Sequence, residues 1–178
     1  MKGLLDLDGV VVDFMGGALR HHGIPNPYDD PKLHGIWDWL RVLGYGDEFW
    51  EPLGADFWAN LDPMPDGFDI LRIVENRFGK NNVCLLTQPC INDECMAGKM
   101  RWIRKHLPDY KNRYLMGPQK EFCAHPDHWL IDDADHNVNA FLKAGGRACL
   151  VPRIWNSLRD RATLPYLRTV LTSQNQEP

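Results

Sequence analysis

Short apolar runs alternate along the chain with segments in which apolar residues recur every three or four positions. The apolar runs are LLDLDGVVVDF (4–14), NNVCLLTQ (81–88), YLMG (114–117), HWLIDD (128–133) and RACLVP (147–152). Continuous apolar runs of this length predict strands that are buried on both faces. Because helical segments separate them, the sequence predicts an α/β fold with a parallel sheet and helices on both of its faces.

Three segments carry the helical spacing. PDGFDILRIVENRFG (65–79) places Phe68, Leu71, Ile73, Val74 and Phe78 on one such spacing. NDECMAGKMRWIRKHLP (92–108) begins with Asn92, a residue suited to a helix N-cap, and NVNAFLKAGG (137–146) ends in glycine. These three segments are the predicted crossover helices.

Polar residues stand at the ends of three predicted strands. They are Asp6 and Asp8 in the first run, Thr87 in the second, and Asp132 and Asp133 in the fourth. A buried carboxylate is costly unless it is paired, protonated or bound to a metal ion. Because ligands of open parallel sheets bind at the carboxyl ends of the strands, we expect these side chains to share one crevice.

The stretch from residue 15 to residue 64 breaks the alternation. It contains no strong strand pattern, is dense in tryptophan, phenylalanine, proline and glycine, and shows only short helical pieces. We predict that 15–64 is a small, mostly helical cap inserted after the first strand, and that 1–14 and 65–178 form the core. So small a cap can hardly bury all its large aromatic residues, so that some are expected to line a pocket for a flat ligand: Trp37, Trp39, Phe49, Trp50, Phe57 and Trp58.

Composition narrows the class of protein. With 178 residues, 44% of them hydrophobic, the chain can bury a sizeable core as one domain. The net charge of −4 argues against a general nucleic-acid or anionic-membrane surface, although a local phosphate pocket stays compatible with it. We expect a cytoplasmic protein, because we find neither a cationic leader nor an apolar membrane span, and the five cysteines fit reduced thiols better than a disulfide framework.

Four ordered motifs resemble those of the haloacid dehalogenase superfamily. They are DLDGVVVDF (6–14), LLTQP (85–89), a lysine ahead of the last motif, and WLIDD (129–133). Within that superfamily, FWANLDPMPDGFDILRIV (57–74) and KMRWIRKHL (99–107) resemble segments of the 5'(3')-deoxyribonucleotidases. The resemblance covers most of the chain and is weakest between residues 16 and 55. It implies a Rossmann-like parallel sheet and phosphatase chemistry.

The aspartates suit phosphomonoester cleavage. Asp6 would attack phosphorus to give an aspartyl-phosphate, and Asp8 would protonate the leaving oxygen and later deprotonate water. Gly9 would let the backbone turn without blocking the phosphate. Asp132 and Asp133 would complete a Mg²⁺ site with a carboxylate oxygen of Asp6 and the main-chain carbonyl of Asp8. Which of the two is the direct ligand stays open.

The remaining predicted site residues contact the phosphate or the base. The Thr87 hydroxyl and the backbone N–H of Gln88 would bind phosphate oxygens, and Lys120 would neutralise the nucleophile and the phosphoryl charge. Lys99 is the competing lysine, and we expect it to face solvent from its helix. Among the aromatic residues, Phe57 and Trp58 are the candidates for the substrate pocket that the resemblance implies.

Simpler interpretations exist for several of these residues. Asp6 and Asp8 could merely cap a turn, but a second acidic pair nearby favours a functional site. Asp13 is expected to have a surface role near the cap hinge. Cys123, His125 and His128 in CAHPDH could suggest zinc, but their spacing is cramped and a loop is the better interpretation.

The sequence therefore predicts a Mg²⁺-dependent phosphatase of nucleoside monophosphates, most readily deoxyribonucleotides. A sugar phosphate or a nucleic-acid 3'-phosphate end is the alternative substrate, and the acidic net charge counts against the latter. A third hypothesis is a non-catalytic binding domain that kept the fold. The predicted partner is a small nucleotide, without a membrane or a stable nucleic-acid partner, and a homodimer is an alternative to a monomer by analogy only.

Overall fold

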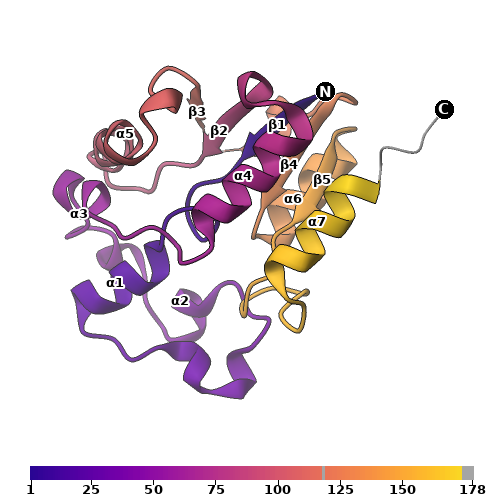
Figure 1. Ribbon diagram of the computed structural model, residues 1–178. Coiled ribbons are helices and arrows are strands. Elements are labelled where there is room, and N and C mark those ends of the chain that lie inside the picture. The colour runs from indigo at the N-terminus through magenta and orange to yellow at the C-terminus, as the bar shows by residue number, and fades with distance from the viewer. Residues whose placement is uncertain (118, 174–178) are drawn as a thin grey trace.

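A parallel β-sheet forms the centre of the protein (Figure 1). The computed structural model describes residues 1–117 and 119–173, and within them five strands form this sheet in the order β3-β2-β1-β4-β5. The strands are β1 (Lys2–Leu5), β2 (Val83–Thr87), β3 (Tyr114–Met116), β4 (His128–Asp132) and β5 (Arg147–Leu150). The pairings between these strands are parallel, as predicted, so the carboxyl ends meet at one edge.

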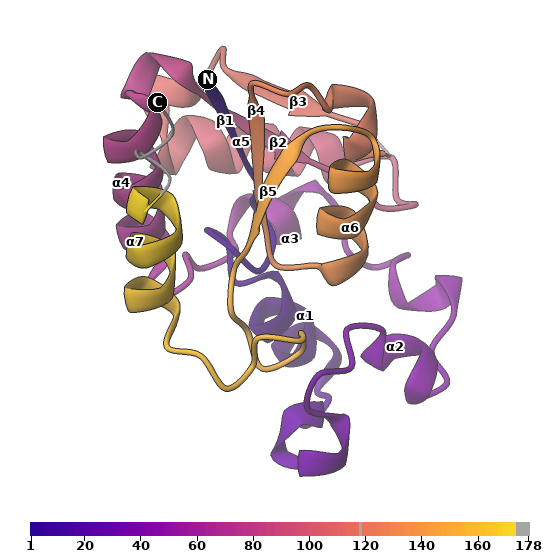
Figure 2. The same cartoon turned by 90° about the vertical axis from the view of Figure 1, so that its right-hand side faces the viewer.

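Helices cover both faces of the sheet, as the alternation predicted (Figure 2). They are α1 (Phe14–His22), α2 (Trp39–Val42), α3 (Ala55–Ala59), α4 (Gly67–Phe78), α5 (Cys95–His106), α6 (Asp135–Lys143) and α7 (Thr163–Ser173). Helices α4 and α7 lie on one face and α6 lies on the other. Within the described residues, no helix is both long enough and apolar enough to cross a bilayer.

Side-chain alternation along the strands divides the core into two clusters. Leu5 on β1 and Ile131 on β4 join the larger cluster, together with buried residues of α4, α5 and α7. Leu4 and Leu130, one position earlier on each strand, join the smaller cluster with Phe141 of α6. This is the two-residue period of a strand, and it explains why the predicted runs are apolar throughout.

The first strand is shorter than its apolar run. The prediction that 4–14 is a strand is wrong beyond Leu5, because the pairing ends there and the chain turns. The three valines 10–12 are buried although they lie in a loop, at 0%, 0% and 3% exposure. The apolar run 4–14 therefore predicted burial correctly but did not predict where the strand ends.

Two details of the predicted helices also differ. In α4 the residue facing the core is Ile70, at 0% exposure, whereas Phe68 is 40% exposed, because Gly67, Ile70, Leu71 and Val74 share one helical face. Helix α5 begins after Glu94, not after Asn92. The Asn92 side chain accepts a hydrogen bond from the Glu94 N–H at 2.9 Å, so Asn92 stabilises the turn before the helix.

The segment 15–64 contains α1, α2, α3 and short 3₁₀ turns, and α1 and α2 lie beyond the carboxyl ends of the strands (Figure 1). Helix α3 packs directly on α5, where a Cβ at Gly98 would lie 2.5 Å from the Ala55 carbonyl oxygen. Asp13, expected near this hinge, caps α1 by accepting the Gly16 N–H at 2.9 Å, and it pairs with Arg20. Whether 15–64 is a separate cap stays a prediction.

Candidate active site

A tight turn after β1 carries the first two aspartates to the carboxyl edge of the sheet. The carbonyl of Leu7 accepts hydrogen bonds from three successive amides, those of residues 10–12, at 2.8–3.2 Å. Gly9 within this turn has a φ of +74°, a conformation that side-chain-bearing residues rarely adopt. The turn leaves both Asp6 and Asp8 on the lining of one pocket.

Gly9 also permits a close approach of two chain segments. A Cβ at this position would lie 2.2 Å from Oδ2 of Asp133 and 3.2 Å from Cζ2 of Trp155. No rearrangement of a flexible side-chain tip relieves so short a contact, because Asp133 is buried and hydrogen-bonded. We expected the absence of a side chain at Gly9 to leave room for the phosphate. In the structure, the group for which it leaves room is the Asp133 carboxylate.

Three buried carboxylates and one lysine meet beneath the turn. One oxygen each from Asp6, Asp132 and Asp133 lies within 4.8 Å of the others. Lys120, which is 2% exposed, places Nζ 2.7 Å from Oδ1 of Asp6 and 2.6 Å from Oδ2 of Asp132. Asp6 directly follows β1, Asp132 and Asp133 lie at the end of β4 and just after it, and Lys120 begins the 3₁₀ turn Lys120–Cys123, so the sheet edge brings together residues more than a hundred positions apart.

The cluster carries more negative charge than Lys120 can balance. Burial raises the pKa of Asp6 to about 7, with contributions from Asp132 and Asp8 and against the effect of Lys120. Burial, together with the carboxylates of Asp132 and Asp6, raises the pKa of Asp133 well above its usual value. Burial alone would favour a neutral Lys120, but the carboxylates of Asp132 and Asp6 raise the pKa of its ammonium. Hard oxygen donors with uncompensated charge fit a divalent cation such as Mg²⁺.

Asp132 and Asp133 have different surroundings. Asp132 is fully buried, and both of its oxygens have partners: Oδ1 accepts the Ala134 N–H at 2.9 Å and Oδ2 accepts Lys120, while the Asn137 amide reaches both. Asp133 lines the pocket, and only its Oδ2 accepts a hydrogen bond among the described residues, from Trp155. Of these two aspartates, Asp133 is therefore the one with a free oxygen at the pocket.

The prediction that Lys99 faces solvent is wrong. Lys99 is 3% exposed, and its ammonium forms an ion pair with Asp8 while donating hydrogen bonds to the Thr87 hydroxyl at 3.0 Å and the Gln88 carbonyl at 2.5 Å. The ring of Trp58 lies 4.8 Å from Nζ. Lys99 and Lys120 thus each hold one of the two aspartates of the first motif.

The two residues predicted to bind phosphate lie at the end of β2. Gln88 lines the pocket, whereas Thr87 is fully buried and does not reach the lining. The Thr87 hydroxyl accepts a hydrogen bond from Lys99. Thr87 therefore holds the Lys99 ammonium in place and does not itself contact the pocket.

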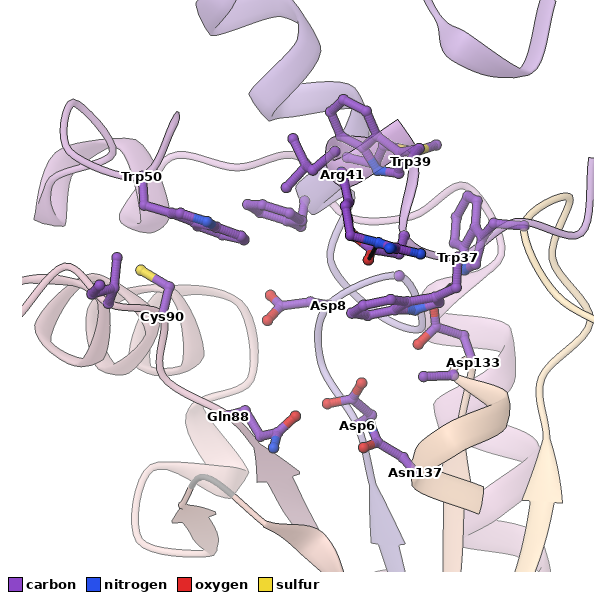
Figure 3. A pocket seen from close by; sticks show the side chains of 18 of the residues that line it. Asp6, Asp8, Trp37, Trp39, Arg41, Trp50, Gln88, Cys90, Asp133 and Asn137 are labelled. Carbon is purple, nitrogen blue, oxygen red and sulfur yellow. Dashed lines mark hydrogen bonds and ion pairs between the residues drawn. The ribbon is translucent and has the colours of Figure 1, made fainter. Parts of the chain in front are cut away.

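The pocket encloses about 560 Å³ between the sheet edge and the segment 15–64. In Figure 3, Asp6 and Asp8 lie beneath Trp39, Arg41 and Trp50. Most of the predicted site residues line it: Asp6, Asp8, Gly9, Trp58, Gln88, Lys120 and Asp133. Thr87, Asp132 and Phe57 lie outside the lining.

Phe57 packs against α1 rather than lining the pocket. Its ring lies 6.4 Å from Phe14 and 5.3 Å from His21. The Phe14 ring in turn stacks between Trp50 and Trp58, at 5.6 and 4.9 Å, and itself belongs to the aromatic lining of the pocket. Phe57 and Trp58 are adjacent in sequence, but only Trp58 has its ring at the pocket, because successive residues of a helix point about 100° apart.

The segment after β5 contributes groups that the motifs did not mark. Arg153 donates to the carbonyls of Gly9 at 2.7 Å and Val10 at 3.2 Å, and it forms a bidentate pair with Asp66. Trp155 donates to Asp133. The sequence did indicate that these residues could belong to the site. RIWN (153–156) follows the carboxyl end of an apolar run, just as the aspartates of the first and last motifs do.

The CAHPDH segment forms the loop before β4, as predicted. A ring nitrogen of His128 lies 2.9 Å from the Cys123 carbonyl oxygen, a contact that positions the loop. Among the described residues, the aspartate cluster is the group with metal-ligand geometry. The five cysteines are free thiols.

Comparisons with known proteins agree with this geometry. Residues 3–156 match the model of the family "5' nucleotidase, deoxy (Pyrimidine), cytosolic type C protein". The chain is 28% identical over 143 residues to the human cytosolic 5'(3')-deoxyribonucleotidase, covering 74% of this chain and 70% of that protein. It is 28% identical over 147 residues to the mouse mitochondrial 5'(3')-deoxyribonucleotidase, covering 75% of this chain but 64% of that protein.

A solved structure of similar fold comes from Streptococcus pneumoniae. It is a hydrolase of the haloacid dehalogenase-like family with a TM-score of 0.56 and 14% identity, covering 94% of this chain and 90% of that chain. At this identity the likeness shows the fold alone. The family match, which spans most of the chain, places the protein in the deoxy (pyrimidine) cytosolic type C 5' nucleotidase family, and it is a phosphatase with the haloacid dehalogenase fold.

Proposed function

We propose that the protein is a Mg²⁺-dependent phosphatase of nucleoside monophosphates, with deoxyribonucleotides as the preferred class, and that it acts through an aspartyl-phosphate on Asp6. One observation carries the proposal. Asp6 and Asp8 open into the same pocket, and a different buried lysine is paired with each. Two carboxylates held separately in this way can take different roles.

Asp6 is the nucleophile in the first step. Its carboxylate oxygen forms a bond to phosphorus as the bond between phosphorus and the ester oxygen breaks. Asp8 gives a proton to the departing oxygen, which leaves as an alcohol. Lys120, 2.7 Å from Asp6, stabilises the negative charge on the phosphoryl oxygens and holds the nucleophile in place.

Hydrolysis of the aspartyl-phosphate completes the cycle. Asp8, now ionised, accepts a proton from water as the water oxygen attacks phosphorus. The bond between phosphorus and the Asp6 oxygen breaks, which releases inorganic phosphate and restores both side chains. Lys99 keeps the Asp8 carboxylate directed at the pocket through their ion pair, with Thr87 and the Gln88 carbonyl fixing the ammonium.

The cation would be held by Asp6 and Asp133, with the main-chain carbonyl of Asp8 as a further candidate ligand. Asp132 fits a positioning role better, because Lys120, Ala134 and Asn137 already occupy its oxygens. When bound, Mg²⁺ would supply positive charge that reduces repulsion between the phosphate and the carboxylates.

The pocket wall favours a flat substrate group. Four tryptophans line it together with the aspartates, and its volume suits a small molecule: Trp37, Trp39, Trp50 and Trp58. An aromatic base can stack on such rings while its phosphate reaches Asp6. The relatives' names supply the deoxyribonucleotide preference. A cytoplasmic location and a homodimer stay predictions.

The proposal is tested by phosphate release from a panel of deoxyribonucleoside, ribonucleoside and sugar monophosphates, with Mg²⁺ and with a chelator. We expect release from deoxyribonucleoside monophosphates only when Mg²⁺ is present, and we expect Asp6→Asn to abolish it. Asp13→Asn is the matched control, because Asp13 belongs to the same loop but caps α1 and lies outside the pocket lining.

The panel separates the alternatives. Release from sugar phosphates alone would retain the chemistry and overturn the nucleotide assignment. Equal phosphate release with Mg²⁺ and with a chelator would contradict the proposed requirement for the cation. If no substrate yields phosphate, a binding role gains support.

A further inference from the structure

Trp155 lies at the boundary between the acidic cluster and the pocket. It follows β5, is 9% exposed, and lines the pocket. Its indole Nε1 donates a hydrogen bond to Oδ2 of Asp133 at 2.7 Å. The ring packs 5.9 Å from Tyr28 on the other side. Neither the four motifs nor the family match assigns this side chain a role.

The indole hydrogen bond fixes the orientation of the Asp133 carboxylate. Oδ2 is occupied by Trp155, and among the described residues Oδ1 accepts no hydrogen bond. Turning the carboxylate away from this angle would break the bond to Trp155 in a buried setting, where an unpaired indole N–H costs about 1–3 kcal/mol. The hydrogen bond therefore holds the carboxylate at one angle, with one oxygen on Trp155 and the other free of protein hydrogen-bond donors among the described residues.

Asn156 fixes the main chain of the same aspartate. It is fully buried, and its Nδ2 donates to the carbonyls of Asp133 at 2.9 Å and Val151 at 2.7 Å. Two adjacent residues after β5 thus hold both the backbone and the carboxylate of Asp133. Gly9 lies close to the same oxygen, because a Cβ at this position would be 2.2 Å from Oδ2 of Asp133.

We propose that Trp155 is a positioning residue for the divalent cation, acting through the Nε1–Oδ2 hydrogen bond that presents Oδ1 of Asp133 to the pocket. The inference rests on the proposed function, because it assumes that Asp133 binds the cation. Partners of metal ligands at this distance commonly change metal affinity by about 10- to 100-fold when they are removed.

The competing explanation is packing alone, since the Trp155 ring also fills space beside Tyr28. Trp155→Phe tests the two against each other, because phenylalanine keeps an aromatic ring and loses the N–H. Trp129→Phe is the matched control. Trp129 is 2% exposed on β4, and its Nε1 has no hydrogen-bond partner among the described residues. Both variants remove a buried indole N–H, but only one removes a hydrogen bond to a carboxylate.

The experiment is calorimetric titration of the full-length protein with MgCl₂, for wild type and both variants, followed by phosphatase assays across the same Mg²⁺ range. We expect Trp155→Phe to weaken Mg²⁺ binding about 10-fold or more. The Mg²⁺ concentration for half-maximal activity should rise by the same factor, and the rate at saturating Mg²⁺ should change less. Trp129→Phe should match the wild type in Mg²⁺ affinity.

A second measurement uses only the wild-type protein, and it tests the inference even if Trp155→Phe does not fold. Indole N–H resonances of the ¹⁵N-labelled wild type are followed during addition of Mn²⁺, and Trp155 is assigned through its contact with the Tyr28 ring. We expect the Trp155 signal to broaden first and the Trp129 signal to persist.

The outcomes distinguish the inference from the proposed function. Unchanged Mg²⁺ affinity in a folded Trp155→Phe protein, with wild-type binding intact, would overturn the positioning role alone. Absence of Mg²⁺ binding by the wild type would overturn both. Equal weakening in both tryptophan variants would identify packing as the cause, and equal broadening of the two indole signals would contradict a cation site beside Trp155.

Discussion

Lys99 is the residue whose placement most changes the chemistry expected at Asp8. Its ammonium is enclosed by α5, by the end of β2 and by the Trp58 ring, and it forms an ion pair with the Asp8 carboxylate. A lysine so placed orients the Asp8 carboxylate for its exchange of protons with the leaving oxygen and with water. It also keeps that carboxylate at the pocket.

Replacement of this lysine should therefore affect catalysis. We expect Lys99→Met to lower kcat/KM about 100-fold, a typical cost for losing one electrostatic group of an active site. Lys105→Met, an exposed lysine of the same helix, is the control and should keep wild-type kinetics. Equal kinetics for the two variants, measured on the same nucleotide, would show that Lys99 is only structural.

Cys90 is a second residue with a distinctive environment. A hydrogen bond with the buried Cys95 thiol lowers the pKa of Cys90 to about 7, although burial opposes this. Its thiol lines the pocket. Because the thiolate is the reactive form, alkylation by iodoacetamide should accelerate as the pH rises through about 7 and then level off.

Mass spectrometry of the alkylated protein gives the test. Cys123, whose pKa is raised by burial, should react more slowly at pH 7 and is the internal control. Inorganic phosphate with Mg²⁺ should protect Cys90 if the pocket is the phosphate site. A Cys90 rate that tracks Cys123 at every pH would contradict the assignment.

At the scale of elements, the loop after β1 depends on Gly9. Gly9→Ala would force alanine into a left-handed conformation and drive its Cβ against Asp133. Gly23 at the end of α1 also has a positive φ, of 64°, but a Cβ there meets nothing within 4 Å. We expect about 1–2 kcal/mol of lost stability for Gly23→Ala, with activity retained.

Gly9→Ala should lose activity as well as stability. Denaturant unfolding and nucleotide assays of both alanine variants give the comparison. If both lost stability equally and both kept wild-type kcat, the contact between Gly9 and Asp133 would have no role in the site.

The sequence predicted the sheet well because parallel strands are apolar on both faces. It overextended β1 because the valines 10–12 are equally buried in a loop, so burial did not reveal backbone conformation. Gly9 was the residue in the sequence that indicated a turn at this point instead of a continuing strand. The strand-end aspartates and Lys120 converge as expected.

The lysine of α5 was misplaced for a different reason. Lys99, Trp102 and Ile103 share one helical face at spacings of three and four, so periodicity alone put Lys99 on the apolar side. The ordinary preference of lysine for solvent outweighed that signal. Which aromatic residues line the pocket could not be predicted, because short helices and turns carry no extended period.

At the scale of the whole molecule, the net charge of −4 conceals a site in which two buried lysines face an acidic cluster. Charge in that cluster stays uncompensated, so Mg²⁺ should stabilise the folded protein. At about 100 times the Kd, binding to the folded state alone contributes about 2.7 kcal/mol. For a protein of this size that corresponds to a Tm increase of roughly 5–11 °C.

Thermal unfolding with MgCl₂, compared with NaCl at equal ionic strength, measures this increase. Asp133→Asn should reduce or abolish it, because that variant removes the carboxylate with the free oxygen. An equal increase in NaCl would attribute the effect to screening and would argue against a specific cation site.

The central claim is that Asp6 forms a covalent bond to phosphorus. It is tested most directly by acid quenching of the enzyme during turnover of a deoxyribonucleoside monophosphate, followed by borohydride reduction and peptide mass spectrometry. The proposed mechanism predicts conversion of residue 6, and no other aspartate, to homoserine in proportion to the trapped enzyme. Modification of Asp8 instead, or rapid phosphate release by Asp6→Asn with no residue modified, would contradict it.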